Sequence, residues 1–229
     1  DEVMGDLFAQ VGALEVCDRM LVEFLEQYDL SDLKLLSHEI QTRAETAMRA
    51  AIRKIPDGTY CSTINLDGFE GFPLKIECAI TVSEDEIEVD YGGTSGQTDL
   101  AAINVASTYT AAWTAFTLKS ILDPATNKSE GSYRPFDIHA PEGCILNATS
   151  PAPVAARHTV GRIVCSAILD ALAPALPGQV IADCGSNPDL ICLFSGIGPD
   201  GFFFLRPPWA PVPPTRWAAP PRCQASSNR

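Results

Sequence analysis

The sequence predicts an α+β fold: an antiparallel helical hairpin, then a β-meander, then further buried helices. Apolar residues recur at steps of three and four over the first 55 residues, which is the period of an amphipathic helix. They alternate with polar residues over 75–91, which is the period of a half-buried strand. With 229 residues, 46% of them hydrophobic, the chain is long enough to bury a substantial core.

Residues 6–28 form the first predicted helix. Its apolar residues at helical spacing are Leu7, Val11, Leu14, Cys17, Leu21, Phe24 and Tyr28. A second helix, 33–55, begins after the expected N-cap Ser31 and stops at Pro56-Asp57-Gly58, which favours a turn. Because the link between two such long helices is short, an antiparallel hairpin is expected.

Three strands are expected after the hairpin. Residues 75–82 place Ile76, Cys78, Ile80 and Val82 on one face. Residues 86–91 repeat this alternation beyond a turn at 83–85, and 59–66 supply the third strand. Strands that follow one another along the chain favour an antiparallel meander.

Two further helices are predicted in the second half of the chain. Asn104 is the expected cap of a helix over 105–122, which is apolar or small nearly all round and therefore buried. The other helix covers 159–173. Between them runs a proline-rich connection, 123–156, with one short strand at 136–139; connections this long are usually functional or packed.

The composition changes abruptly after residue 205, although short strands are expected near 180–182, 190–194 and 202–205. Residues 206–229 contain seven prolines, four arginines and no acidic residue. We therefore divide the chain into 1–205 and a tail, 206–229, interpreted as disordered or out of frame. A natural proline-rich tail that binds a partner is the alternative.

The charge and cysteine content of the chain indicate which binding partners and which cellular compartment are expected. A formal net charge of −13 argues against nonspecific binding to nucleic acid or anionic membrane. No apolar run reaches the length of a membrane-spanning helix. The first residue is Asp1 rather than Met and residues 1–7 lack a signal-peptide pattern, so the chain starts as though cut from something longer. Eight cysteines without a C-x-x-C pair favour a reducing cytoplasm.

Several polar residues have both a functional and a structural interpretation. Asp90 precedes Gly92-Gly93 at a strand end, where loops often carry function, but a turn carboxylate binding backbone N–H groups is equally reasonable. Arg134 and Arg157 could clamp a carboxylate, carbonyl or phosphoryl group, or tie a long loop to the acidic surface. His158 is either a helix-end surface residue or a ligand; none of the three histidines has the i, i+4 spacing of a helical zinc pair.

Eight short segments, each present once, follow one another in a characteristic order between residues 5 and 205. They are GDLFAQ at 5–10, AETAMR at 44–49, IPDGTY at 55–60, VDYGGTSGQ at 89–97, Ile103-Asn104, Asn127 with 131–135, APEGC at 140–144 and SPAPVAAR at 150–157. In this order and spacing, they resemble the hydantoinase B family.

The resemblance implies a large cytoplasmic subunit that works with a hydantoinase A-type partner in a hetero-oligomer. The partner would bind ATP and phosphorylate the substrate's carbonyl oxygen. The first hypothesis is an ATP-dependent hydrolase of cyclic amides such as hydantoin, oxoproline or lactams. The second is a biotin-independent acetone or acetophenone carboxylase. The third is that this chain alone is a noncatalytic fragment lacking the metal site.

This sequence departs from the family pattern at several places, which limits how many of the family's functional residues can be assigned to it. The family's metal motif lies upstream of this chain, so a divalent metal (Zn, Mn or Mg) is expected in the parent protein, with no ligand here. The family's downstream glycine-rich segments are absent, and Arg157-His158 stands where oxoprolinase-like relatives tend to have Gly-Asn, which favours the hydantoinase or carboxylase branch. The expected catalytic residues are Asp90, Arg157 and His158. The expected substrate-binding residues are Gly92, Gly93, Thr94, Asn104, Asn127 and Arg134.

Overall fold

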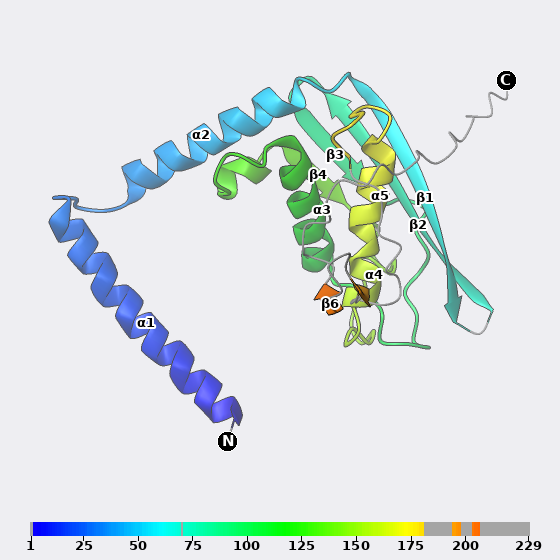
Figure 1. Ribbon diagram of the computed structural model, residues 1–229, viewed down its shortest axis with the longest axis horizontal. Coiled ribbons are helices and arrows are strands. Elements are labelled where there is room, and N and C mark those ends of the chain that lie inside the picture. The colour runs from blue at the N-terminus through cyan, green and yellow to red at the C-terminus, as the bar shows by residue number, and fades with distance from the viewer. Residues whose placement is uncertain (1, 70, 181–193, 198–202, 207–229) are drawn as a thin grey trace. The chain divides into compact units, whose positions relative to one another are not determined.

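The computed structural model describes residues 2–69, 71–180, 194–197 and 203–206. The chain divides into two compact units, residues 1–182 and 183–229. The first unit combines helices with a mixed four-stranded sheet (Figure 1), so the predicted α+β class is confirmed. No described helix has both the length and the apolar character needed to cross a membrane.

The sheet has the strand order β1-β2-β3-β4. Strands β1 (Gly58–Phe69), β2 (Phe72–Ser83) and β3 (Glu86–Asp90) form the predicted antiparallel meander. Strand β4 (Phe136–His139) is the short strand expected in the long connection, and it pairs with β3 in parallel. The sequence pattern did not reveal this parallel pairing, which makes the sheet mixed.

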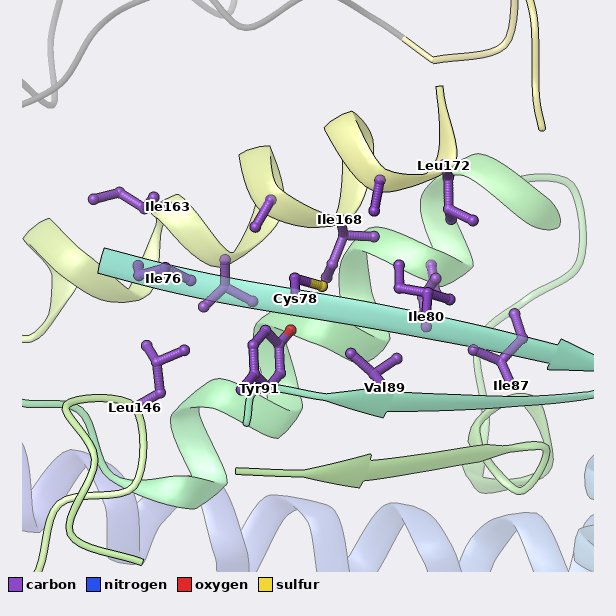
Figure 2. Close-up of a cluster of buried hydrophobic side chains, with 14 of the residues drawn as sticks. Ile76, Cys78, Ile80, Ile87, Val89, Tyr91, Leu146, Ile163, Ile168 and Leu172 are labelled. Carbon is purple, nitrogen blue, oxygen red and sulfur yellow. The ribbon is translucent and has the colours of Figure 1, made fainter. Parts of the chain in front are cut away.

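One face of the sheet carries the core. Ile76, Cys78 and Ile80 of β2 are buried, as are Ile87 and Val89 of β3. Figure 2 shows these side chains with Tyr91 and with Ile163, Ile168 and Leu172 of the overlying helix. The alternate residues, among them the exposed Lys75 and Glu88, lie on the opposite, polar face. The period-two alternation thus predicted the buried face correctly.

Helix α5 (Ile163–Leu172) covers β1 and β2, and α3 (Ser107–Leu122) packs against α5. The Ser62 hydroxyl of β1 donates to the Ala167 carbonyl at 2.7 Å, which ties α5 to the sheet. A short helix, α4 (His158–Gly161), precedes α5, so the helix predicted over 159–173 is interrupted at Arg162.

The first two helices are α1 (Glu2–Gln27) and α2 (Lys34–Ile52). The C-terminal half of α2 enters the core through Met48 and Ile52, both fully buried. The expected antiparallel packing of α1 on α2 is not formed, because the α1 side chains predicted to face inward, such as Leu7 and Leu14, are exposed. A short link allows a hairpin but does not supply the contacts that hold one together.

Three other local expectations need correction. The N-cap of α2 is Leu33 rather than Ser31, and Asp32 accepts the Lys34 N–H at 2.9 Å. The N-cap of α3 is Ala106 rather than Asn104. Val180 does not belong to a strand. In the second unit, β5 (Phe194–Ile197) and β6 (Phe203–Arg206) pair antiparallel. The strand residues expected at 181–182 and 190–193, and the tail beyond Arg206, lie outside the described residues.

Candidate functional site

Two long loops interlock where the parallel strands β3 and β4 end. We call residues 91–106 and 140–157 together the loop junction. The Gln97 N–H donates to the Gly143 carbonyl at 2.8 Å, and the Val105 N–H donates to the Ile145 carbonyl at 2.8 Å. The Ala156 N–H also donates to the Ala102 carbonyl at 2.6 Å. The loops are therefore held together along their length, although neither is a helix or a strand.

Asp90 and the glycine turn form the start of the loop junction. Asp90 Oδ1 accepts the Gly92 N–H at 2.8 Å. Gly93 has a φ of 87°, which favours glycine because a Cβ is poorly tolerated there. The Thr94 hydroxyl accepts the Glu77 N–H at 3.1 Å, so the turn is fastened to β2. The carboxylate of Asp90 stabilises a turn, as its structural interpretation expected. That turn also lies at the end of a strand, the position on which its functional interpretation was based.

The Asn104 side chain joins the two loops. It is fully buried. Its Oδ1 accepts the Thr98 N–H at 2.8 Å, and its Nδ2 donates to the Thr98 carbonyl at 2.7 Å and to the Pro153 carbonyl at 2.9 Å. The amide therefore holds the shape of the loop junction from inside.

Arg157 and His158 lie at the exposed end of the loop junction. The Arg157 guanidinium stands over the Tyr109 ring, 5.7 Å from its centroid, a distance within the cation–π range. Tyr109 in turn packs against Gly161, where a Cβ would lie 2.3 Å from the ring's Cε1 atom. This stack orients the Arg157 cation at the surface, while His158 begins α4 beside it.

Arg134 and Asn127 belong to a different part of the fold. Arg134 donates through Nη1 to Glu45 Oε2 at 3.0 Å and through Nη2 to Gln41 Oε1 at 2.6 Å. It therefore ties η1 (Glu130–Tyr133) to α2, as the structural interpretation of this arginine expected. Asn127 is exposed and follows Thr126, whose carbonyl accepts from the buried Lys119 at 2.8 Å. The described contacts link Arg134 to α2 and Thr126, the neighbour of Asn127, to α3, and none of them reaches the loop junction.

A cavity of about 400 Å³ lies between the end of β4 and the first turns of α3. It is lined by Ser107, Thr108, Thr110, Ala111, Ile138, His139, Ala140, Glu142 and Asn147. None of the residues expected to bind substrate lines it. His139 lines this cavity but was not among the expected site residues. The parallel register of β3 and β4, which pairs Asp90 with His139, would have identified it as a candidate. This pairing could not be predicted from the sequence, because a long connection separates the two strands.

Three buried hydroxyl groups tie both loops of the loop junction to α3. The Tyr91 and Thr114 hydroxyl oxygens lie 2.7 Å apart, and Thr114 Oγ1 donates to the Thr110 carbonyl at 2.8 Å. Thr110 Oγ1 donates to the Leu146 carbonyl at 2.6 Å. Burial holds the pKa of Tyr91 well above its ordinary value, so the phenol stays neutral and keeps its proton for hydrogen bonding.

Within residues 2–69, 71–180, 194–197 and 203–206, no group of three His, Cys, Asp or Glu side chains is arranged to hold a metal ion. The donor set of these described residues therefore does not fit a metal site. The candidate site residues of this chain are the turn carboxylate Asp90 and the exposed Arg157 with its neighbour His158; the cavity beside β4 is lined by other residues.

The chain thus combines a meander covered by buried helices with two interlocked loops at the strand ends. The chain belongs to the Hydantoinase B/oxoprolinase family, whose model matches residues 1–211.

Two relatives show which members it resembles. One, from Pseudomonas sp. (strain NS671), is named as the B-type component of a putative D-/L-hydantoinase; it is 34% identical over 196 residues, covering 80% of this chain and 33% of the relative. The other, the beta component of the caprolactamase of Pseudomonas jessenii, is 30% identical, covering 79% of this chain and 32% of the relative. The chain thus spans about a third of the length of these relatives.

Solved structures agree with this fold. The ATP-dependent caprolactamase from Pseudomonas jessenii superposes with a TM-score of 0.67 at 29% identity, covering 76% of this chain and 31% of the other. A nucleotide-free acetone carboxylase superposes with a TM-score of 0.52 at 14% identity, covering 59% of this chain and 20% of the other. The second likeness shows a shared fold alone.

Proposed function

We propose that this chain is part of a hydantoinase B-type subunit of an ATP-dependent hydrolase that opens cyclic amides such as hydantoins, oxoproline or lactams. The observation that carries this proposal is the 34% identity to the B-type component of a hydantoinase over 80% of the chain. The likeness to an ATP-dependent caprolactamase, in both sequence and structure, supports a cyclic amide as the substrate class.

In this proposal, the loop junction forms one wall of the site. Arg157 faces solvent from a stack that orients it, so it can bind the developing negative charge on the substrate's carbonyl oxygen or on a phosphoryl group. His158 and Asp90 are the proposed proton-transfer groups, and Gly92, Gly93 and Thr94 shape the wall. Asn104 contributes by holding the two loops together.

The proposed partner is a hydantoinase A-type subunit that binds ATP and activates the amide carbonyl. Phosphorylation of a carbonyl oxygen turns a poor electrophile into one that water attacks readily. The divalent metal proposed for the complete subunit would activate water or polarise the intermediate, with ligands outside this chain. The proposed compartment is the cytoplasm.

The carboxylase hypothesis has weaker support. It rests on a structural neighbour at 14% identity, which shows the fold and not the reaction. The hydrolase hypothesis has relatives at 30% identity or above in addition to a structural neighbour.

The decisive experiment is substrate-stimulated ATP hydrolysis by the full-length subunit purified with its partner. Hydantoins, oxoproline, lactams and alkyl or aryl ketones are compared with and without bicarbonate. Stimulation by a cyclic amide without bicarbonate is the expected result. Product formation from a ketone only in the presence of bicarbonate would establish the carboxylase instead.

The chain alone is tested separately. It is expected to unfold in one cooperative thermal transition and to hydrolyse no cyclic amide. Turnover by the isolated 229 residues would refute the hypothesis that the chain alone is noncatalytic.

A further inference from the structure

Helix α1 exposes an unusually large apolar surface. Its exposed apolar side chains are Val3, Met4, Leu7, Phe8, Val11, Leu14, Val16, Met20, Leu21, Val22 and Phe24. Leu14, for example, is 70% exposed. Scattered surface leucines are ordinary, but a contiguous apolar patch of this kind marks an interaction surface in a soluble protein.

The apolar residues of α1 follow a heptad repeat. Steps alternating between three and four residues run through Met4, Leu7, Val11, Leu14, Asp18, Leu21 and Leu25 and reach Tyr28 just after the helix, and we call these residues the seam. Asp18 is the single charged residue of the seam. Phe8 and Val22 flank the seam and widen it. This pattern is typical of a helix that packs lengthwise against other helices.

The charges of α1 indicate what kind of helix fits. From residue 6 to residue 26 the helix carries Asp6, Glu15, Asp18, Glu23 and Glu26, against one basic residue, Arg19. A second copy of α1 would bring these acidic side chains together, which opposes self-association. A helix with lysine or arginine beside its apolar stripe is complementary to the seam.

The length of the relatives indicates where that helix comes from. The chain covers 33% of the hydantoinase relative and 31% of the caprolactamase chain, and α1 lies inside the region matched by the family model. Helix α1 therefore belongs to the part of the chain that matches the family, and a protein of the relatives' length carries about twice as much further polypeptide that can cover the seam.

We propose that the seam of α1 is the docking surface for an apolar helix, flanked by basic residues, from a part of the same polypeptide outside these 229 residues. This proposal depends on family membership and not on the reaction that the protein catalyses. A negative crosslinking result would therefore leave the hydrolase proposal unaffected, and the reverse also holds.

Site-specific photo-crosslinking in the full-length subunit, purified with its partner, tests the proposal. The photoreactive residue p-benzoylphenylalanine replaces Leu14 on the seam or, as the control, Arg19 on the other side of α1. Mass spectrometry is expected to find crosslinks from position 14 to a segment of the same polypeptide that lies outside these 229 residues and contains lysine or arginine, and none to that segment from position 19. Crosslinks from position 14 to any of these 229 residues, to the partner protein, to a differently isotope-labelled second copy, or to nothing would each overturn the proposal.

The charge argument is tested in the same assay. Glu15→Lys and Asp18→Lys together reverse two charges that are exposed in this chain. The crosslink yield from position 14 is expected to fall by about threefold or more at low salt, with recovery as salt screens the repulsion. A yield that the double substitution leaves unchanged would reject a basic-flanked partner helix.

Discussion

Asp90 and His139 stand side by side at the ends of the parallel strands β3 and β4. The backbone confirms this neighbourhood, because the Tyr91 N–H donates to the His139 carbonyl at 2.9 Å. Ligands of open sheets with parallel strands commonly bind beyond the carboxyl ends of those strands. Here, that position coincides with the loop junction and with the cavity that His139 lines.

We therefore expect Asp90→Asn in the full-length subunit with its partner to lower turnover by about tenfold or more, since an amide cannot transfer a proton as a carboxylate does. Substrate-stimulated ATP hydrolysis measures this effect. Glu88→Gln, the same change two residues earlier on the exposed face of β3, is the control and should leave turnover unchanged. Equal rates for Asp90→Asn and the control would remove Asp90 from the chemistry.

Arg157→Ala is also expected to lower turnover by about tenfold or more in the complete complex, because a positioned cation near the reacting oxygen stabilises its charge. The matched control is Arg43→Ala, which removes an exposed arginine paired with Glu39 on α2. Full activity of a correctly folded Arg157→Ala variant would show that the arginine only stacks on Tyr109.

Asn104→Ala should destabilise the chain by about 2–3 kcal/mol, because the Thr98 and Pro153 carbonyls and the Thr98 N–H lose a buried partner. Urea unfolding followed by circular dichroism measures the change. Asn65→Ala on the exposed face of β1 is the control, with an effect within about 0.5 kcal/mol. If the two variants unfold alike, the amide is not what holds the loops together.

Acid should weaken the attachment of η1 to α2. Hydrogen bonds from Arg134 and Arg49 hold the pKa of Glu45 below its ordinary value, so folding is stabilised while this carboxylate is charged. That contribution is complete above the ordinary value of 4.5 and is lost as the pH falls through the lower, folded-state pKa.

The measurement is the unfolding free energy of the chain between neutral pH and the acid range. We expect a smaller decline below about pH 4.5 in Glu45→Gln than in the unmodified chain, since glutamine does not titrate. A parallel decline in both proteins would contradict the assignment.

The two faces of the sheet predict different cysteine reactivity. Cys61 of β1 is exposed, whereas Cys78 of β2 is buried, and burial raises the pKa of Cys78 to about 12. Alkylation of the native chain near pH 8 should therefore label Cys61 quickly and leave Cys78 protected until the chain unfolds, because only the thiolate reacts. Equal labelling rates in peptide mass spectra would show that the proposed burial is wrong.

Sequence periodicity was sufficient for the local structure. The alternation of Ile76, Cys78 and Ile80 with polar neighbours identified β2 and its buried face, because side-chain direction in a strand depends only on position along the chain. The helix predicted over 105–122, observed as Ser107–Leu122, and the short strand at 136–139 likewise followed from composition and spacing. The family was also recognisable from the order of short segments between residues 5 and 205, and the family comparison confirms it.

Tertiary structure alone decided which distant residues meet. The partners Asn104 and Pro153 are 49 residues apart, and the pairing of Asp90 with His139 spans the same distance. No local pattern encodes such contacts, because they depend on how the loops and strands pack once the core has formed. The periodicity of α1 likewise predicted an apolar face, but not that the described part of the chain leaves this face exposed, because burial requires a second surface that periodicity cannot specify.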